Sequence, residues 1–315
     1  MAFARADGAG IVLFMAPTPL SFSTAPIAPA AALPWAPSAA SASAPLHSAF
    51  YRFTPVPDPV ATAEAVRGLA QGLFGSITMA REGINGAVSG ATAAVHCFEQ
   101  ALQDRAMLHG ALAGMAFKHS ACTTAPFARL KVLVKPEIVT LALPGSGELA
   151  APDEDDESHL SPAHWRAMLA QGDAVVLDNR NHFEVRLGRF LGAADPQVRH
   201  FRDLVAYVQQ HADDWRVAGR PVAMYCTGGV RCDKTAPWLR SLGLQVLQLD
   251  GGILNYFASL PDAELDWQGE CFVFDKRVAL DSQLRETATT ADQVFDADHP
   301  GEAWRLARAL RLDAF

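Results

Sequence analysis

The chain has 315 residues, of which 50% are hydrophobic and 19% are charged, so it is long enough for two ordinary globular domains. Its 34 acidic side chains outnumber its 26 basic ones and give a formal net charge of −8, which excludes a global basic field; any nucleic-acid binding requires a local patch. Five cysteines without zinc-finger spacing do not make a disulfide framework and favour a reducing compartment.

Residues 1–46 form a segment rich in Ala, Pro and Ser, which we expect to be a disordered extension. Its prolines, scattered from Pro17 to Pro45, would interrupt any helix or strand. A short apolar run at residues 11–16, after Arg5, leaves a signal peptide as the alternative, although prolines follow it closely. No stretch approaches the length of a transmembrane helix, so we expect no association with a membrane.

The next segment, residues 47–143, has the pattern of a small α+β domain. Asp58-Pro59 is typical of a helix start, and a second helix is predicted at residues 92–102. Asn85-Gly86 is a strong turn signal within the predicted connection of a β-hairpin. With further strands predicted near residues 50–53, 117–119 and 130–134, the order of elements predicts a ferredoxin-like split βαβ domain.

Residues 144–157 are interpreted as an acidic linker, because Pro and Gly interrupt them and five consecutive acidic residues close the segment. A solvated charge run is favoured there over a metal site. From residue 158 to residue 265 predicted strands and helices alternate, beginning with a helix capped at Ser161-Pro162, which predicts a parallel α/β domain. Residues 266–315 form a tail that ends in a predicted helix at residues 302–312.

The motif with the clearest chemistry lies in the α/β domain. A predicted strand at residues 222–226 ends on Cys226, Thr227-Gly228-Gly229-Val230-Arg231 follows as a loop, and a helix is predicted at residues 234–242. Convergent loop amides and the charge of Arg231 would lower the pKa of the Cys226 thiol, so both residues are predicted to be catalytic. The alternative for Arg231 is a pair with a carboxylate elsewhere in the chain. Cys232 is either a supporting thiol or, as we favour, a packed helix residue.

This cysteine-led loop has the form of a rhodanese active-site loop. Cys-Thr-Gly-Gly-Val-Arg-Cys-Asp-Lys at residues 226–234, together with Arg-Glu-Gly-Ile-Asn-Gly at residues 81–86, resembles the rhodanese-domain tRNA uridine hydroxylases. In bacteria those enzymes hydroxylate the wobble uridine with molecular oxygen. The resemblance implies a ferredoxin-like α+β domain followed by a rhodanese-like parallel α/β domain. It also implies a cytoplasmic oxidoreductase that acts on the tRNA anticodon arm with oxygen as co-substrate.

The same resemblance bears on cofactors and metals. The sequence shows no evident flavin, haem or iron ligand set. Many members of the family carry a cysteine-rich segment near the C-terminus, whereas no cysteine follows Cys271 here. We therefore expect no cofactor and no bound zinc.

Substrate binding is predicted for a basic concentration that follows the first strand of the rhodanese-like domain. Its members are Arg180, Arg186, Arg189 and Arg199, and the first motif adds Arg81 and Asn85. Acidic neighbours such as Glu184 leave an internally paired surface as the alternative to a tRNA contact. Asp178, at the end of that strand, is expected to be structural.

Two other functions remain open. In a rhodanese-type sulfurtransferase, Cys226 would carry sulfane sulfur as a persulfide. A catalytically idle binding module of the same fold would tend to lose the loop cysteine, which this chain keeps. In the hydroxylase itself, Cys226 is expected to act as a thiolate adduct, a persulfide or an oxidised intermediate.

Overall fold

The computed structural model describes residues 45–143 and 158–313. The predicted extension up to residue 44 and the whole predicted acidic linker lie outside the described residues. Within the described part of the chain, no helix is long and apolar enough to cross a membrane.

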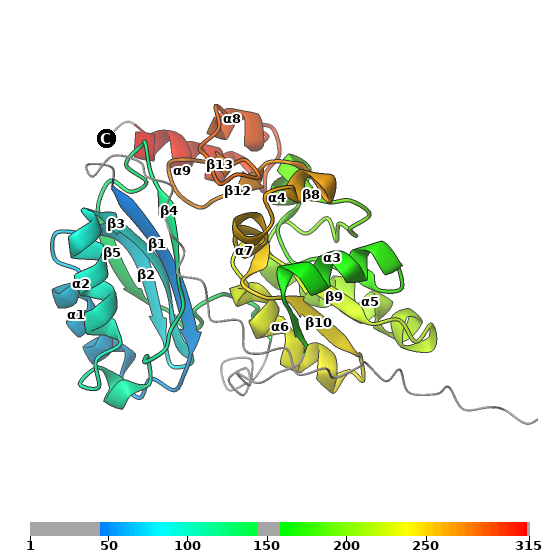
Figure 1. Ribbon diagram of the computed structural model, residues 1–315, viewed down its shortest axis with the longest axis horizontal. Coiled ribbons are helices and arrows are strands. Elements are labelled where there is room, and N and C mark those ends of the chain that lie inside the picture. The colour runs from blue at the N-terminus through cyan, green and yellow to red at the C-terminus, as the bar shows by residue number, and fades with distance from the viewer. Residues whose placement is uncertain (1–44, 144–157, 314–315) are drawn as a thin grey trace, which may run out of the picture. The chain divides into compact units, whose positions relative to one another are not determined.

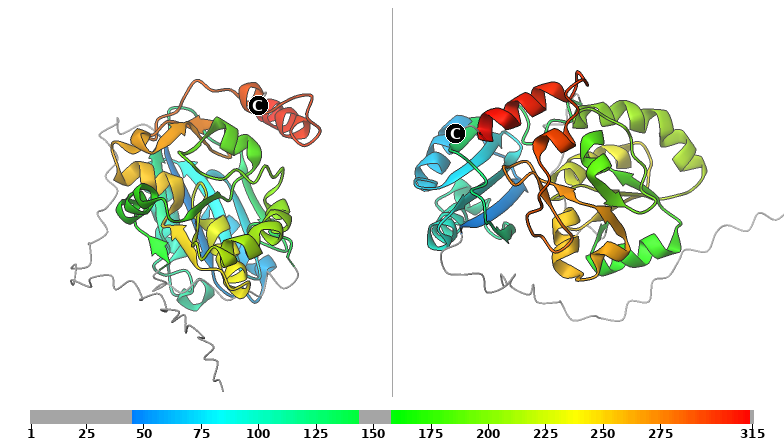
Figure 2. Two further views of the ribbon diagram at one scale, coloured as in Figure 1. Left: turned by 90° about the vertical axis from the view of Figure 1, so that its right-hand side faces the viewer. Right: turned by 90° about the horizontal axis from the view of Figure 1, so that it is seen from above.

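The first domain is a five-stranded sheet with two helices packed on one face (Figures 1 and 2). Its elements are β1 (Leu46–Phe53), α1 (Pro59–Leu69), β2 (Phe74–Ala80), β3 (Gly83–Gly90), α2 (Thr92–Leu102), β4 (Phe117–Ala121) and β5 (Leu130–Val134). The strand order is β4-β1-β3-β2-β5, antiparallel except for β5, which runs parallel to β2. The predicted ferredoxin-like split βαβ arrangement is confirmed, with β5 added at one edge.

Local sequence signals explain how these helices begin and what they bury. The carboxylate of Asp58 accepts hydrogen bonds from the amides of Val60 and Ala61, both at 3.0 Å, so α1 begins where it was predicted. Helices α1 and α2 then bury Val66 and Phe98 in the hydrophobic core that lies against the sheet.

The hairpin between β2 and β3 differs from the prediction. Arg81-Glu82 makes the turn, whereas Asn85-Gly86 lies inside β3. Gly86 pairs with Phe50 on one side and Ile77 on the other, and a Cβ at Gly86 would lie 2.9 Å from the Ile77 Cα. The glycine therefore serves the close approach of neighbouring strands rather than a turn.

The second domain is a four-stranded parallel sheet, in the order β6-β10-β9-β7, with helices on both faces. Its elements are β6 (His159–Leu160), α3 (Pro162–Gln171), β7 (Val175–Asp178), α4 (His182–Leu187), β8 (Gly188–Phe190), α5 (Leu204–Val217), β9 (Val222–Tyr225), α6 (Val230–Ser241), β10 (Val246–Leu249) and α7 (Gly252–Ser259). The Ser161 hydroxyl caps α3 as predicted. The predicted parallel α/β domain is confirmed.

Alternation along β9 separates two hydrophobic cores. Val222 and Met224 pack in one core with residues of α5 and α6, whereas Ala223 and Tyr225 pack in the other with residues of α3 and α7. Because every side chain of β9 is buried, this strand lies at the centre of the domain and fixes the position of Cys226, which follows it directly.

The C-terminal part packs against the second domain and also touches the first. It contains β11 (Trp267–Gly269), β12 (Cys271–Phe272), β13 (Ala279–Leu280), α8 (Ala291–Val294) and α9 (Ala303–Asp313). Helices α8 and α9 lie side by side (Figure 1), and their cluster with α4 includes Phe183 and Phe295. Arg277 donates to the Ser120 hydroxyl of β4 at 2.7 Å and so ties this part to the first domain.

Candidate active site

Cys226 lies at the carboxyl end of β9 and is only 1% exposed. Helix α6 begins at Val230, four residues earlier than predicted, so the loop is shorter and its last amides belong to a helix start. The Gly229 amide donates to the Cys226 sulfur at 3.1 Å. Gly229 has φ 102°, and a Cβ there would lie 2.6 Å from the Tyr51 hydroxyl, so both its conformation and its surroundings require glycine.

The surroundings of Cys226 favour its thiolate. Burial opposes ionisation, but a hydrogen bond with the Cys232 thiol, the charge of Arg231 and the amides of Arg231 and Gly229 lower the Cys226 pKa to about 6. Burial and the adjacent Cys226 raise the pKa of Cys232 well above its usual range. Cys232 is therefore the thiol that donates to the Cys226 thiolate, a role beyond the packing that we favoured from the sequence.

We expect a titration of the protein to show this shift. As the pH falls, the ultraviolet absorbance of the Cys226 thiolate should disappear with a midpoint near pH 6, because the thiol form dominates below that pKa. The Cys232→Ala variant loses the hydrogen-bond donor and should titrate about 1 pH unit higher. The measurement is the absorbance difference between each protein and its matching Cys226→Ser variant. A midpoint at the ordinary thiol value of about 8.5 would contradict the proposed stabilisation.

Arg231 reaches the site as predicted, and its guanidinium is held by Glu184, which the sequence analysis named only as a possible partner of the neighbouring arginines. Two of its nitrogens donate to the two carboxylate oxygens of Glu184, at 2.7 and 2.9 Å, and both side chains are buried. Glu184 lies on α4, where it also accepts from the amide of Asn181. This bidentate pair orients Arg231 next to Cys226.

Two residues of the first domain contact the cysteine loop. The Tyr51 hydroxyl donates to Asp233 at 2.9 Å, and the Lys118 ammonium donates to the Gly228 carbonyl at 2.5 Å. Lys118 also lies 5.0 Å from the centre of the Tyr51 ring. Burial lowers the pKa of Lys118, and the Cys226 charge opposes that shift. Both residues were missed as site residues because nothing near them in the sequence marks the contact.

The two sequence motifs meet through a buried ion pair. Lys234, the last residue of the cysteine motif, pairs with Glu82 of the Arg81–Gly86 motif and, at 3.2 Å, with Glu137. Lys234 is 2% exposed. Arg81 and Asn85 of this motif were predicted to bind substrate, but it is Glu82 that reaches the helix after the loop.

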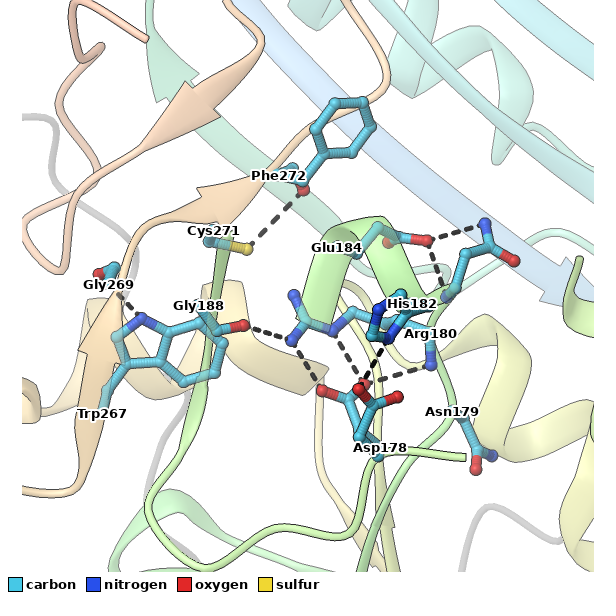
Figure 3. Close-up of polar contacts among 12 residues, drawn as sticks. Asp178, Asn179, Arg180, His182, Glu184, Gly188, Trp267, Gly269, Cys271 and Phe272 are labelled. Carbon is cyan, nitrogen blue, oxygen red and sulfur yellow. Dashed lines mark hydrogen bonds and ion pairs between the residues drawn. The ribbon is translucent and has the colours of Figure 1, made fainter. Parts of the chain in front are cut away.

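Arg180 is enclosed, contrary to the prediction that it binds substrate. Its guanidinium donates to both carboxylate oxygens of Asp178, at 2.8 and 2.7 Å, and to the Gly188 carbonyl at 2.6 Å (Figure 3). The central carbon of the guanidinium, Cζ, lies 5.6 Å from the centre of the Tyr225 ring and 5.3 Å from the centre of the Trp267 ring. Both charged side chains are 0% exposed. Arg180 is therefore a structural residue, and Asp178, which we expected to be structural, is its partner.

The other predicted arginines of this domain remain nearer the surface. Arg186 and Arg199 are exposed and line one pocket together with His182 and His299. Arg186 also pairs with Glu302 at 2.9 Å, so part of its charge is neutralised. The structure thus brings two of the predicted substrate-binding arginines together.

The remaining predicted residues lie apart from this pocket. Arg189 is partly buried in β8. Asn85 donates to the Ile138 carbonyl at 3.1 Å, and it pairs with Tyr51 across β1 and β3, whereas the exposed Arg81 lies at the hairpin turn. Asn85 is thus a neighbour of Tyr51, which contacts the residues after the cysteine loop, whereas Arg81 does not belong to the site around Cys226.

Comparisons with known proteins match the first domain by itself and the two domains together. A family model described as UPF0176 acylphosphatase like domain matches residues 46–138, which correspond to the five-stranded domain. The chain is 41% identical over 255 residues to the tRNA uridine(34) hydroxylase of Nitrobacter winogradskyi, which covers 80% of this chain and 98% of that protein. It is 43% identical over 239 residues to the Synechococcus elongatus protein of the same name, with 75% and 85% covered. The crystal structure of reduced Bacillus anthracis CoADR-RHD is similar at 11% identity and a TM-score of 0.31, over 70% of this chain and 35% of that one.

Proposed function

Because this chain belongs to the tRNA uridine(34) hydroxylase family, we propose that it hydroxylates carbon five of the wobble uridine in tRNA, with Cys226 as the nucleophile and molecular oxygen as co-substrate. The observation that carries the proposal is the buried Cys226, whose sulfur accepts a hydrogen bond from the Gly229 amide at 3.1 Å. These surroundings and the charge of Arg231 lower the pKa of Cys226 to about 6, which favours the thiolate at neutral pH. A thiolate is the form of cysteine that attacks an electrophilic carbon.

The chemistry begins with addition of the Cys226 sulfur to carbon six of the uracil ring. The new bond raises the electron density at carbon five, which prepares that carbon to react with oxygen. One oxygen atom then bonds to carbon five as hydroxyl, and the other leaves as water after a dithiol reductant supplies two electrons and two protons and is oxidised to a disulfide. Loss of the remaining hydrogen of carbon five as a proton, together with expulsion of the thiolate, restores the double bond between carbons five and six. The low pKa of Cys226 makes the sulfur a good leaving group for this last step.

Access to Cys226 requires that contacts over the loop be released. Tyr51 contacts Asp233, and Lys118 contacts Gly228 in the loop that follows Cys226. The Cys226 side chain itself is buried. A uridine that reaches it must leave the base stack, which costs least in a single-stranded loop. This geometry supports the anticodon loop, rather than paired RNA, as the substrate.

Helix α4 supports a site for the tRNA backbone. Its Glu184 holds Arg231 beside Cys226, while Phe183 and Arg186 of the same short helix line the pocket that also contains Arg199. A phosphate group in this pocket would therefore be connected to the cysteine loop through one rigid element. We propose that Arg199 and Arg186 bind the backbone of the anticodon arm.

Arg199 gives this backbone site a test. Arg199→Gln should weaken tRNA binding and reduce the slope of log affinity against log salt by about one counterion, because one phosphate contact is lost. Binding titrations of tRNA at several salt concentrations measure both quantities. Arg285→Gln, which removes an exposed arginine elsewhere on the chain, is the matched control. Equal slopes for the two variants would place the tRNA backbone elsewhere.

Mass spectrometry of tRNA nucleosides tests the proposed activity. In cells that lack this gene, the intact protein should restore wobble nucleosides derived from 5-hydroxyuridine, and Cys226→Ser should restore none. Cys97→Ser, which changes an exposed cysteine in the first domain, should restore them fully. If neither the intact protein nor Cys226→Ser changes the nucleosides, and the purified protein instead transfers sulfur from thiosulfate, sulfurtransfer through a Cys226 persulfide replaces the hydroxylase proposal.

A further inference from the structure

Three side chains with metal-binding atoms converge between α2 and β4 in the first domain. The Glu99 carboxylate lies 2.6 Å from Nε2 of His119, and the donor atoms of His96, Glu99 and His119 all lie within 4.8 Å of one another. The two histidine rings are 5.6 Å apart. None of the three belongs to the cysteine site, and the proposed hydroxylation uses none of them.

Helical spacing and strand register explain the convergence. His96 and Glu99 are three residues apart on α2 and therefore lie on the same side of the helix. His119 on β4 pairs with Ser48 on β1, so both side chains lie on one face of the sheet. That face is the one α2 covers, because Ser48 donates to Glu99 at 2.6 Å.

The cluster has the components of a built site rather than of a solvated surface pair. Glu99 is 7% exposed, and it accepts hydrogen bonds from both Ser48 and His119. A buried carboxylate needs a positive partner; protonated His119 can serve as one, and a metal ion bound between the two would take over that role. Ser48 would orient the ligating carboxylate from outside, as the outer hydrogen-bond partners of metal ligands do. His96, the exposed member, leaves the cluster open to solvent.

We propose that His96, Glu99 and His119 bind one divalent transition-metal ion, with Zn²⁺ as the expected ion. This site is separate from the C-terminal cysteine-rich segment, whose absence was the reason to expect no bound zinc. Two imidazoles and one carboxylate are a zinc ligand set that leaves the fourth position for water or another ligand. Zinc bonds of about 2.0–2.2 Å in a tetrahedral arrangement place two ligand atoms about 3.3–3.6 Å apart. The contact between His119 and Glu99 must therefore open, and the exposed His96 side chain has room to move toward the metal. On binding, Nε2 of His119 exchanges the proton that it donates to Glu99 for the metal, and the neutral imidazole then carries its single proton on Nδ1.

Metal titration of the full-length protein tests this site. After treatment with a chelator and incubation with Zn²⁺ alone, the desalted protein should retain one zinc per chain by elemental mass spectrometry. His96→Gln and His119→Gln should each lose that zinc. Ser48→Ala, which keeps all three ligands, should bind about 10–100-fold more weakly. Co²⁺ should give the visible absorption of a four-coordinate site in the intact protein and not in His96→Gln.

Two comparisons keep the outcome clear. His164→Gln, at an exposed histidine on α3, is the matched control and should retain the full equivalent of zinc. Because His96 is exposed, its replacement should leave the thermal unfolding of the chelator-treated protein unchanged, so loss of zinc reports the ligand and not the fold. The proposal is overturned if the intact protein retains no zinc, or if His96→Gln and His164→Gln retain equal amounts. Either result leaves the proposed tRNA chemistry untouched.

Discussion

Replacing Arg180 with Met is expected to lower the free energy of unfolding by about 3–5 kcal/mol, because the change leaves the carboxylate of Asp178 buried without its partner. The loss should appear as a shift of the urea midpoint with an unchanged slope. A substrate-binding arginine would behave differently: its removal would leave the urea midpoint in place and weaken tRNA binding.

A surface arginine and a double replacement are the controls. Arg202→Met removes an arginine whose side chain is 59% exposed and should change stability by no more than about 0.5 kcal/mol. Replacing Asp178 with Leu as well as Arg180 with Met should recover part of the loss, since no uncompensated charge remains. A loss below about 1 kcal/mol for Arg180→Met alone would show that the pair is not the structural anchor inferred here.

Lys234→Met should also lower the free energy of unfolding by about 3–5 kcal/mol. Lys234 is the shared positive partner of Glu82 and Glu137, and its removal leaves these two carboxylates near each other without it. Urea unfolding is the measurement, and the loss should be accompanied by lower activity in the tRNA nucleoside assay. The activity falls because Lys234 belongs to the helix that begins at the cysteine loop and joins it to the first domain.

A double-mutant cycle separates this pair from general damage to the helix. Glu82→Gln together with Lys234→Met should cost less than the sum of the single changes, since contacting residues are not additive. Lys135→Met, at an exposed lysine of the first domain, should be nearly neutral. Strict additivity of the two single changes would mean that the ion pair does not couple the two motifs.

Features decided within a few residues were predictable from the sequence. The caps at Asp58 and Ser161 bond to amides two or three residues away, so the local pattern contains the whole interaction. Cys226 was also found locally, because a strand end, glycines and a helix start are adjacent in the chain. The split βαβ and parallel α/β arrangements followed from the order of such elements.

Features decided by distant partners were not predictable. Tyr51 and Asp233 are 182 residues apart, and Lys118 and Gly228 are 110 residues apart, so no local pattern marks either contact. The arginine after a strand end was equally ambiguous: the enclosure of Arg180 depends on Tyr225 and Trp267. The turn predicted at Asn85-Gly86 was wrong for the same reason. Pairing with β1 and β2 on either side holds the dipeptide in an extended strand, which its own turn preference does not reveal.

Strand β1 serves different chemistry on its two faces, and this restricts how its length can change. Ser48 points to α2 and the metal-binding cluster, while Tyr51, an odd number of residues later, points to the cysteine loop. A single residue inserted between them would turn one of the two side chains to the wrong face. Insertions are accepted in surface loops, but an insertion here would separate Ser48 at the metal-binding cluster from Tyr51 at the cysteine loop. Both sites therefore depend on the same interval of three residues.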